Sequence, residues 1–205
     1  MAIFTTLERS AVASTTYGLV VEGPYDVAIY GELIRKVIPS VSTIVSRPAG
    51  GKTKLASLLR PLLRDLEHAV HGHPVDKVMV VRDTNGKDAR AVEDQMNQRI
   101  LGQSFTFPRG TQLHAVRRTA ETWLLADVSA VNFVARSRGG REVAEVNEDL
   151  EEIVDPKGRL RRLLSQAGLP FDPAVCQEIA ARIEIEKLRY RCPSFGIFER
   201  RVLDC

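Results

Sequence analysis

The chain has 205 residues, a formal net charge of +3 and an isoelectric point near 8.9. This length suits one domain with a small appendage. Hydrophobic residues make up 44% and charged residues 27%, which is ordinary for a globular protein and excludes a chain built from low-complexity sequence. The mild excess of positive charge permits a nucleic-acid partner without requiring one.

The cysteines and the apolar runs favour a cytoplasmic protein that does not enter a membrane. Cys176, Cys192 and Cys205 are widely spaced and form no CxxC pair, as expected in a reducing compartment. Glu8 and Arg9 stand where a signal peptide would have its apolar core. The sequence has no apolar run long enough to span a membrane.

Strands and helices are predicted to alternate through the first 130 residues. Short apolar, β-branched runs are typical of buried strands, and apolar residues at helical spacing are typical of helices. In chain order, the predicted elements are a strand at 17–21, a helix at 25–38, a strand at 42–46, a helix at 53–70, a strand at 77–83, a helix at 88–101, a strand at 112–118 and a helix at 120–131. Pro61 lies inside the second helix, so we expect a kink there or two short helices.

This order predicts an α/β fold in which helices cover both faces of a mostly parallel sheet. We assign residues 1–135 to this three-layer, Rossmann-like domain. The remaining residues, 136–205, change character: 146–169 and 172–190 are helical in pattern, and a short aromatic tail follows. We expect them to form a helical C-terminal extension that packs on the sheet domain.

The segment "GGKT", residues 50–53, raises the question of a phosphate-binding P-loop. A P-loop needs a glycine five residues before Gly51, and that position is Ser46. Pro48 also removes one of the amides that would surround a phosphate. We therefore predict that this loop is not a P-loop. Its glycines allow close backbone approach, and Lys52 at a helix start can meet a phosphate.

Three acidic residues follow strands of the predicted sheet: Glu22, Asp83 and Glu121. The carboxyl ends of parallel strands meet at one edge, where α/β sheets gather their functional groups. Clustered carboxylates repel one another, and Mg²⁺ relieves this by binding one or two of them together with water and phosphate. The alternative is that each acid caps a helix or lies in a solvated turn. Because each of the three acids follows a different strand of the same predicted sheet, we favour a shared metal site.

The motifs around these acids resemble a Toprim domain, the fold shared by topoisomerases, bacterial primases and OLD-type nucleases. The Toprim pattern has Glu-Gly after the first strand, a glycine after the second and Asp-x-Asp after the third. Glu22-Gly23, Gly50-Gly51 and Asp83-Thr84-Asn85 stand at those places. The segments "AETWLLAD" and "CPSFGIF" are similar to a compact, Toprim-like family of unknown function, often encoded beside an AAA/ABC-type ATPase. The resemblance covers nearly the whole chain.

The resemblance implies a role for each matching residue. Glu22 would be a metal ligand or the general acid/base, Asp83 a principal metal ligand, and Glu121 the residue that completes the site. Asp26, one helical turn beyond Glu22, would touch the metal through water. Asn85 departs from the pattern, because it offers a neutral carbonyl in place of the second aspartate. It favours one metal over two, and it leaves open a site that binds phosphate without cleaving it.

Other polar residues near the predicted edge are candidates for contact with a phosphate backbone, which attracts basic groups whatever its sequence. The predicted phosphate or nucleic-acid contacts are Gly50, Gly51, Lys52, Lys87, Arg117 and Arg118. The alternative is that the charged side chains form solvated faces. Asp127 would cap the next segment or hold a metal ligand in place. Trp123 and His114 are expected in the core.

With this acidic edge, the resemblance implies a Mg²⁺- or Mn²⁺-dependent nuclease whose metal, at Glu22, Asp83, Asn85 and Glu121, would activate water, with Lys52 neutralising developing charge. The resemblance implies nucleic acid as substrate, with DNA the expected form, and an AAA/ABC-type ATPase partner in defence against phage. The alternative is a non-catalytic Toprim-like subunit that binds nucleic acid or a nucleotide and regulates its ATPase. A homo-oligomer is left open.

Overall fold

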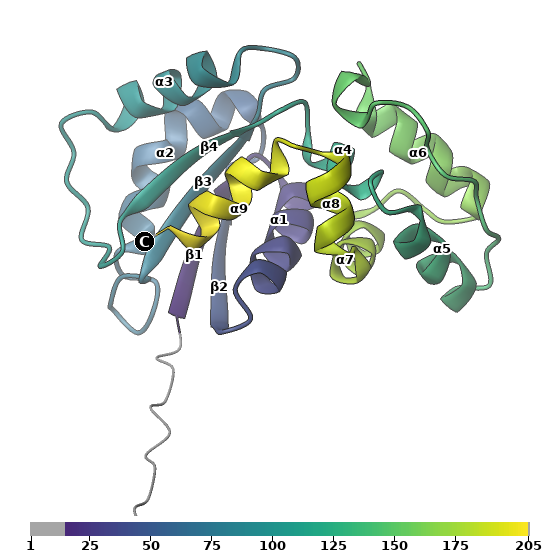
Figure 1. The fold of residues 1–205 in the computed structure, drawn as a ribbon. Helices are drawn as coiled ribbons and strands as arrows, with labels where there is room; N and C mark the ends of the chain where they lie inside the picture. The colour runs from purple at the N-terminus through teal and green to yellow at the C-terminus, as the bar shows by residue number, and fades with distance from the viewer. Residues whose placement is uncertain (1–14, 205) are drawn as a thin grey trace, which may run out of the picture.

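A computed structural model describes residues 15–204 (Figure 1). Glu8, Arg9 and Cys205 lie outside this range. The elements in chain order are β1 (Thr15–Val21), α1 (Pro24–Val37), β2 (Val41–Pro48), α2 (Lys52–Leu66), β3 (Lys77–Asp83), α3 (Ala89–Ile100), β4 (Thr111–Val116), α4 (Ala120–Leu124), α5 (Val128–Ser137), the 3₁₀ helix η1 (Leu150–Glu152), α6 (Pro156–Ala167), α7 (Pro173–Arg182), α8 (Ile185–Arg191) and α9 (Phe195–Leu203). None of these helices is both long and apolar enough to cross a membrane.

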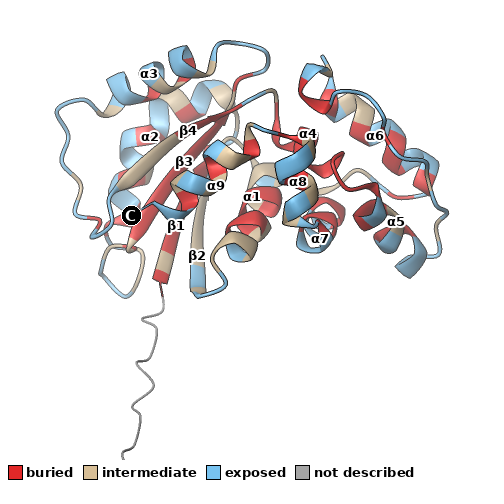
Figure 2. Ribbon diagram, in the orientation of Figure 1, coloured by how far each residue is buried: buried red, intermediate tan, exposed pale blue. Residues whose placement is uncertain are grey.

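The four strands form one all-parallel sheet in the order β2-β1-β3-β4. Side chains alternate between its faces. Leu19 and Met79 belong to a core shared with α1 and the helices after β4, whereas Val20 and Val80 belong to a core shared with α2 and α3. The central strands are almost wholly buried (Figure 2). This arrangement confirms the predicted α/β, three-layer, Rossmann-like fold.

Helix boundaries differ from the predicted ones where single residues control the chain direction. Helix α2 runs unbroken through Pro61, so of the two expected outcomes, a kink or two short helices, the second is wrong. Proline has no N–H, so Pro61 cannot donate the helical hydrogen bond to the carbonyl of Ser57. Both residues lie on the exposed side of the helix, where water can bond to that carbonyl instead. The predicted helix at 120–131 is interrupted between Leu124 and Val128.

The C-terminal segments are also more divided than their patterns indicate. Within 146–169, only η1 and α6 are helical, because Asp155 caps α6 by accepting a hydrogen bond from Gly158 N. The segment 172–190 divides into α7 and α8, and the aromatic tail forms α9. Helix α7 packs against α1, and α9 packs against β4 and α1. Helices α7 and α9 therefore join α1 on one face of the sheet, whereas α5 and α6 lie to the side of it (Figure 1).

A cluster of aromatic side chains joins the sheet domain to these helices. The ring centroid of Trp123 lies 5.7 Å from that of Tyr30, 5.2 Å from that of Phe195 and 5.0 Å from that of Phe198. All four side chains are at most 1% exposed. His114 is buried beside Phe198. The expectation that Trp123 and His114 belong to the core is confirmed.

A buried lysine ties the end of α9 to the first residue of β3. Lys77 is 2% exposed, and its Nζ donates hydrogen bonds to the carbonyls of Arg201, Val202 and Asp204 at 2.7, 2.8 and 2.7 Å. These carbonyls belong to the last turn of a helix, where the backbone carries partial negative charge. The lysine therefore satisfies acceptors that the helix itself cannot.

We expect Lys77→Met to lower the free energy of unfolding by about 2–4 kcal/mol, since it leaves several buried carbonyls without a charged donor. Chemical denaturation at neutral pH measures this loss. The exposed Lys54 provides the control, and Lys54→Met is expected to change stability by less than about 0.5 kcal/mol. Equal stabilities for Lys77→Met and the wild type would contradict the role given to Lys77.

Candidate active site

An open pocket of about 430 Å³ lies at the carboxyl edge of the sheet. Its walls come from the loops after β1, β2, β3 and β4 and from the first turn of α6. The lining residues are Glu22, Gly23, Pro24, Tyr25, Asp26, Gly50, Gly51, Asp83, Asn85, Thr119, Glu121 and Lys157. The structure therefore brings together Glu22, Asp83 and Glu121, the acids that the sequence placed at this edge, with Asp26 beside them.

Glu22 and the loop after β2 are tied together through the backbone. Gly51 N donates to the carbonyl of Glu22 at 2.7 Å, and Ala49 N donates to that of Val21 at 2.9 Å. Gly51 has a φ of +129°, a value that favours glycine. Because its amide is already bonded to Glu22, it cannot surround a phosphate as a P-loop amide does.

Within residues 15–204, one oxygen of the Glu22 carboxylate is left without a hydrogen bond. Its Oε1 is buried and accepts no hydrogen bond from any described residue. The cation nearest to it is Arg82, whose Nε lies 3.8 Å away. A buried carboxylate oxygen without a donor is uncommon, and at a pocket wall it is an available ligand or proton acceptor.

Asp83 is held by the helix on one face of the sheet. Tyr30, from α1, donates its hydroxyl proton to Asp83 Oδ1 at 2.9 Å. Asn85 follows in a left-handed conformation with a φ of +52°, and its Nδ2 donates to the Asp83 carbonyl at 3.4 Å. Its backbone N donates to the carbonyl of Arg118 at 3.0 Å. Asn85 thus lies on the pocket rim in a turn that Asn tolerates better than most residues.

Asp26 and Glu121 complete the acidic wall. Asp26 Oδ2 accepts a hydrogen bond from Gly23 N at 2.8 Å, so this residue caps α1 as well as lining the pocket. Glu121 is only 3% exposed, and its Oε1 lies 3.6 Å from Lys157 Nζ. Asp26 therefore has a second role as a helix cap, while Glu121 is a buried acid paired with one cation.

Burial and mutual repulsion disfavour the charged forms of these acids. Burial, followed by the charges of Glu121 and Glu22, raises the pKa of Asp26 to about 7 despite its bond to the Gly23 amide. Burial, then the charges of Asp26 and Glu121, raises the pKa of Asp83 well above its ordinary value. Burial also raises the pKa of Glu22, although nearby Lys52 lowers it. The pocket thus holds more negative charge than its own residues offset.

Lys157 is the site residue that the sequence reasoning missed. It comes from α6, and its Nζ lies 5.0 Å from the ring centroid of Tyr25 and 5.7 Å from that of Phe171. The two rings stack at 4.7 Å. A lysine in the first turn of a helix is unfavourable, because the helix N-terminus carries partial positive charge. The position of Lys157 after Asp155-Pro156 was therefore the one signal in the sequence that an acidic or aromatic group elsewhere holds this lysine.

Lys52 lies beside the pocket without lining it. It starts α2 and is near enough for its charge to lower the pKa of Glu22, but it lines a neighbouring groove between α2 and α3. Gly50 and Gly51, by contrast, line the pocket itself.

The other predicted phosphate contacts lie elsewhere. Lys87 and Arg117 line a separate hollow of about 800 Å³ beside β4, and Arg117 pairs there with Glu151 at 3.4 Å. Arg118 donates from Nε to the Glu151 carbonyl at 3.2 Å. Both arginines therefore hold η1 against the sheet, and the acidic pocket lacks them.

Asp127 also lies away from the pocket and organises the C-terminal helices. Its carboxylate accepts hydrogen bonds from Ser129 Oγ at 2.8 Å, from Glu184 N at 3.0 Å and from Lys187 Nζ at 2.8 Å. These bonds, with that from Lys187 first, hold the pKa of Asp127 below its ordinary value despite its burial. Asp127 thus fixes the start of α8 against the start of α5.

The chemistry of the acidic pocket suits a hard divalent cation, which prefers carboxylate and carbonyl oxygens. The unpartnered Oε1 of Glu22 and the excess of negative charge agree with such a ligand. Over residues 15–204, however, no three or more His, Cys, Asp or Glu side chains form a group that could hold a metal ion as they stand. The carboxylate and amide oxygens of the pocket are the kinds of ligand that Mg²⁺ and Mn²⁺ bind, but the described side chains do not form a complete coordination shell.

Comparison with known proteins gives one result. No curated protein and no solved structure was found to match the chain. A family model described as a domain of unknown function, DUF4276, matches residues 21–203, a range that contains β2, β3, β4, the acidic pocket and all of the C-terminal helices, and that begins at the last residue of β1. The chain therefore belongs to the DUF4276 family.

Proposed function

We propose that the acidic pocket hydrolyses phosphodiester bonds in nucleic acid when Mg²⁺ or Mn²⁺ is bound. The observation that carries this proposal is the convergence of Glu22, Asp26, Asp83 and Glu121 on one open pocket, with Lys157 as the only cation among its described lining residues. Such a concentration of carboxylates is offset by a divalent cation together with substrate phosphate.

The residues of the pocket have separate roles in this proposal. Glu22, Asp83 and Glu121 would hold the cation, and the carbonyl of Asn85 would add a neutral oxygen. A bound cation would supply an activated water and stabilise charge on the phosphoryl group. Glu22 Oε1, buried without a donor, suits either metal binding or acceptance of a proton. Lys52, close to Glu22, would offset charge on the phosphate that enters.

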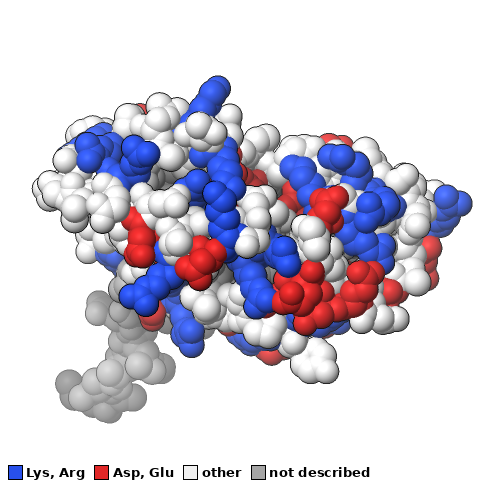
Figure 3. Space-filling view, turned by 90° about the horizontal axis from the view of Figure 1, so that it is seen from above, with Lys and Arg blue, Asp and Glu red and all other residues white. Residues whose placement is uncertain are grey.

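Nucleic acid is the proposed substrate because basic side chains form a band across the molecule when it is viewed from above (Figure 3). Such a band attracts a phosphate backbone. The resemblance to the Toprim family leads us to propose DNA as its form, an AAA/ABC-type ATPase as protein partner and a role in defence against phage. The free, buried thiols of Cys176 and Cys192 support a cytoplasmic location.

A second candidate is a non-catalytic subunit that binds nucleic acid or a nucleotide and regulates an ATPase. Asn85 favours it, because a neutral amide stands at the rim where the resembling pattern has a carboxylate. Such a subunit would bind phosphate in the pocket without activating water.

Cleavage assays on plasmid and single-stranded DNA with Mg²⁺ or Mn²⁺ test the two candidates, with the protein alone and with any ATPase encoded beside it. We expect metal-dependent cleavage that Glu22→Gln and Asp83→Asn each reduce by on the order of 10³-fold, since each removes charge that binds the cation. The exposed acid Glu152 provides a control, and Glu152→Gln should cleave within about twofold of the wild type. Equal background activity for wild type and both variants would reject the nuclease and leave the binding subunit.

A further inference from the structure

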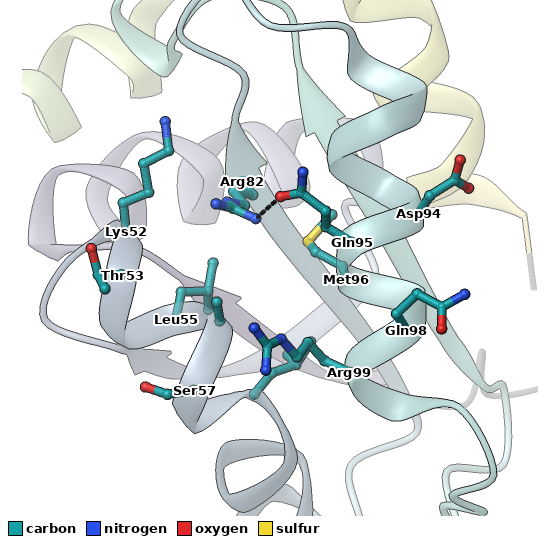
Figure 4. A pocket seen from close by; sticks show the side chains of 12 residues that line it. Lys52, Thr53, Leu55, Ser57, Arg82, Asp94, Gln95, Met96, Gln98 and Arg99 are labelled. Carbon is teal, nitrogen blue, oxygen red and sulfur yellow. Dashed lines mark hydrogen bonds between the residues drawn. The ribbon is translucent and has the colours of Figure 1, made fainter.

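A groove of about 760 Å³ runs between α2 and α3, next to the acidic pocket (Figure 4). Lys52 and Arg82 stand at the end that adjoins Glu22. Asp94 also lines the groove, but its side chain points away from the space between the helices (Figure 4). The basic and the largest apolar side chains of the lining are Lys52, Leu55, Leu59, Arg82, Met96 and Arg99.

Arg82 is a buried cation with too few partners. The residue is 9% exposed, and its Nη1 donates to Gln95 Oε1 at 3.4 Å (Figure 4). Its Nε is buried and donates to no acceptor within residues 15–204; Glu22 Oε1, at 3.8 Å, is too far for a hydrogen bond. A guanidinium has five donors, and burying it with so few bonds is costly. Arg82 thus has donor capacity that Gln95 and Glu22 leave unused, and its guanidinium borders the groove.

The far end of the groove is also positively charged. Arg60 and Arg99 line a further hollow of about 210 Å³ that shares Ala56 and Ser57 with the groove. Arg60 Nε donates to the carbonyl of Arg99, which joins the two helices there. Since Lys52 and Arg60 are two turns apart on α2, the two charged ends are separated by roughly 12 Å along the helix.

Between the two charged ends the groove has an apolar wall. Leu55, Leu59 and Met96 lie behind it with exposed fractions of only 1%, 1% and 2%, so the half-buried Ala56 is the apolar side chain that a ligand would meet first. Gln95 and Gln98, on α3, add amide groups that can both donate and accept hydrogen bonds. A ligand that fits would carry an anionic group at one or both ends and a flat apolar part between them. A phosphorylated sugar lacks that apolar part, whereas a nucleoside phosphate has it, and methionine packs well against aromatic rings.

We propose that the groove between α2 and α3 binds a nucleoside phosphate, with the phosphate on Lys52 and Arg82 and the base against Leu55, Leu59 and Met96. This inference rests on the proposed function and deepens it, because it names a single-stranded segment beside the cleaved bond as the substrate. A second phosphate of such a segment would meet Arg60 and Arg99. A free nucleotide carries the same phosphate and base, so the experiment below compares its binding with that of a single strand.

Binding measured without cleavage tests this proposal. Fluorescence anisotropy of a labelled thymidine 12-mer, in EDTA, gives the Kd of the wild-type chain, and a duplex of the same length and free AMP are titrated as separate arms. Ala56→Trp fills the groove without changing its charge. We expect it to raise the Kd for the 12-mer by about tenfold or more, since it displaces a base from its apolar wall. Leu58→Trp is the matched control on a neighbouring face of α2, where Leu58 is 38% exposed, and should leave the Kd within about twofold.

A charge variant provides an independent measurement. Arg60→Gln combined with Arg99→Gln should weaken binding of the 12-mer and lower the slope of log Kd against log salt concentration by about 1 to 2. Arg90→Gln removes one positive charge from the opposite side of α3, where Arg90 lines the hollow beside β4. Its Kd for the 12-mer should stay within about twofold of the wild-type value, with the same salt dependence.

The outcomes separate this inference from the proposed nuclease. If Ala56→Trp and the double arginine variant both bind like the wild type, or if the wild type binds none of the three ligands, the groove proposal is wrong, whatever the cleavage assay shows. Loss of binding in both variants supports the groove even where the wild type cleaves nothing. If AMP binds tightly and the 12-mer does not bind, the ligand of the groove is a free nucleotide, and the proposal of a single-stranded segment is wrong.

Discussion

Asp26→Asn is expected to raise the free energy of unfolding of the metal-free protein at pH 8 by on the order of 2–4 kcal/mol. Asparagine keeps an oxygen that can accept the hydrogen bond from Gly23 N. It removes a charge that burial disfavours first and that Glu121 and Glu22 disfavour next. The change therefore relieves repulsion without removing the cap of α1.

The sign of the pH dependence follows from the raised pKa. Asp26 has an ordinary pKa of 3.8 and a folded-state pKa of about 7. Between these values the unfolded chain loses the proton while the folded chain keeps it, so the wild type loses stability as pH rises through this window. Asp83, whose pKa is raised in the same direction by burial and then by Asp26, adds to the loss. Above pH 7 the contribution of Asp26 is constant.

Urea denaturation in EDTA between pH 4 and pH 8 measures this difference. The stabilisation by Asp26→Asn should be small at pH 4 and grow to its full size near pH 7. Asp94→Asn, an exposed carboxylate on α3, is the control and should follow the wild type within about 0.5 kcal/mol. Adding Mg²⁺ or Mn²⁺ should raise the Tm of the wild type more at pH 8 than at pH 5. A gap between Asp26→Asn and wild type that stays constant across the range would contradict the repulsion described in the pocket.

Trp123→Ala is expected to lower the free energy of unfolding by about 3–5 kcal/mol. Trp123 is fully buried, and the rings of Tyr30, Phe195 and Phe198 surround it. Its Nε1 has no hydrogen-bond partner in the part of the chain that the structure describes, so the loss comes from packing and from the cavity left behind. The effect is large because one side chain joins α1, α4 and α9.

Thermal and urea denaturation followed by circular dichroism measure this loss, since the chain has one tryptophan and the variant has none. Phe133→Ala removes an aromatic ring that is 42% exposed and lies under Arg182 on the surface of α5. It should cost less than about 1 kcal/mol. If the two variants lose similar stability, the aromatic cluster is not what joins the C-terminal helices to the sheet.

The central part of the fold could be predicted because local pattern and burial agree there. The run at 77–83 is continuous and apolar, as a strand covered on both faces requires, and it forms β3 over the same residues. The places of Glu22 and Asp83 follow from this, since a residue that ends a parallel strand lies at the carboxyl edge whatever its chemistry.

The rest depends on contacts between distant residues that no local pattern records. The interruption after Leu124 goes with the bonds that Asp127 makes to α8. Arg117 and Arg118 looked available for phosphate, but Glu151 engages both through its carboxylate or its carbonyl. Lys157 could be placed only once α6 was seen to dock beside Glu121.

The position of Lys157 in the chain also sets the order in which the pocket is assembled during synthesis. The ribosome produces Glu22, Asp83 and Glu121 before Lys157, and at about 5–20 residues per second α6 follows within several seconds. Until α6 docks, the acids lie in an open, solvated edge without the lysine and aromatic wall. A nascent chain that has made only the sheet therefore carries the carboxylates but lacks the wall that α6 adds to the pocket.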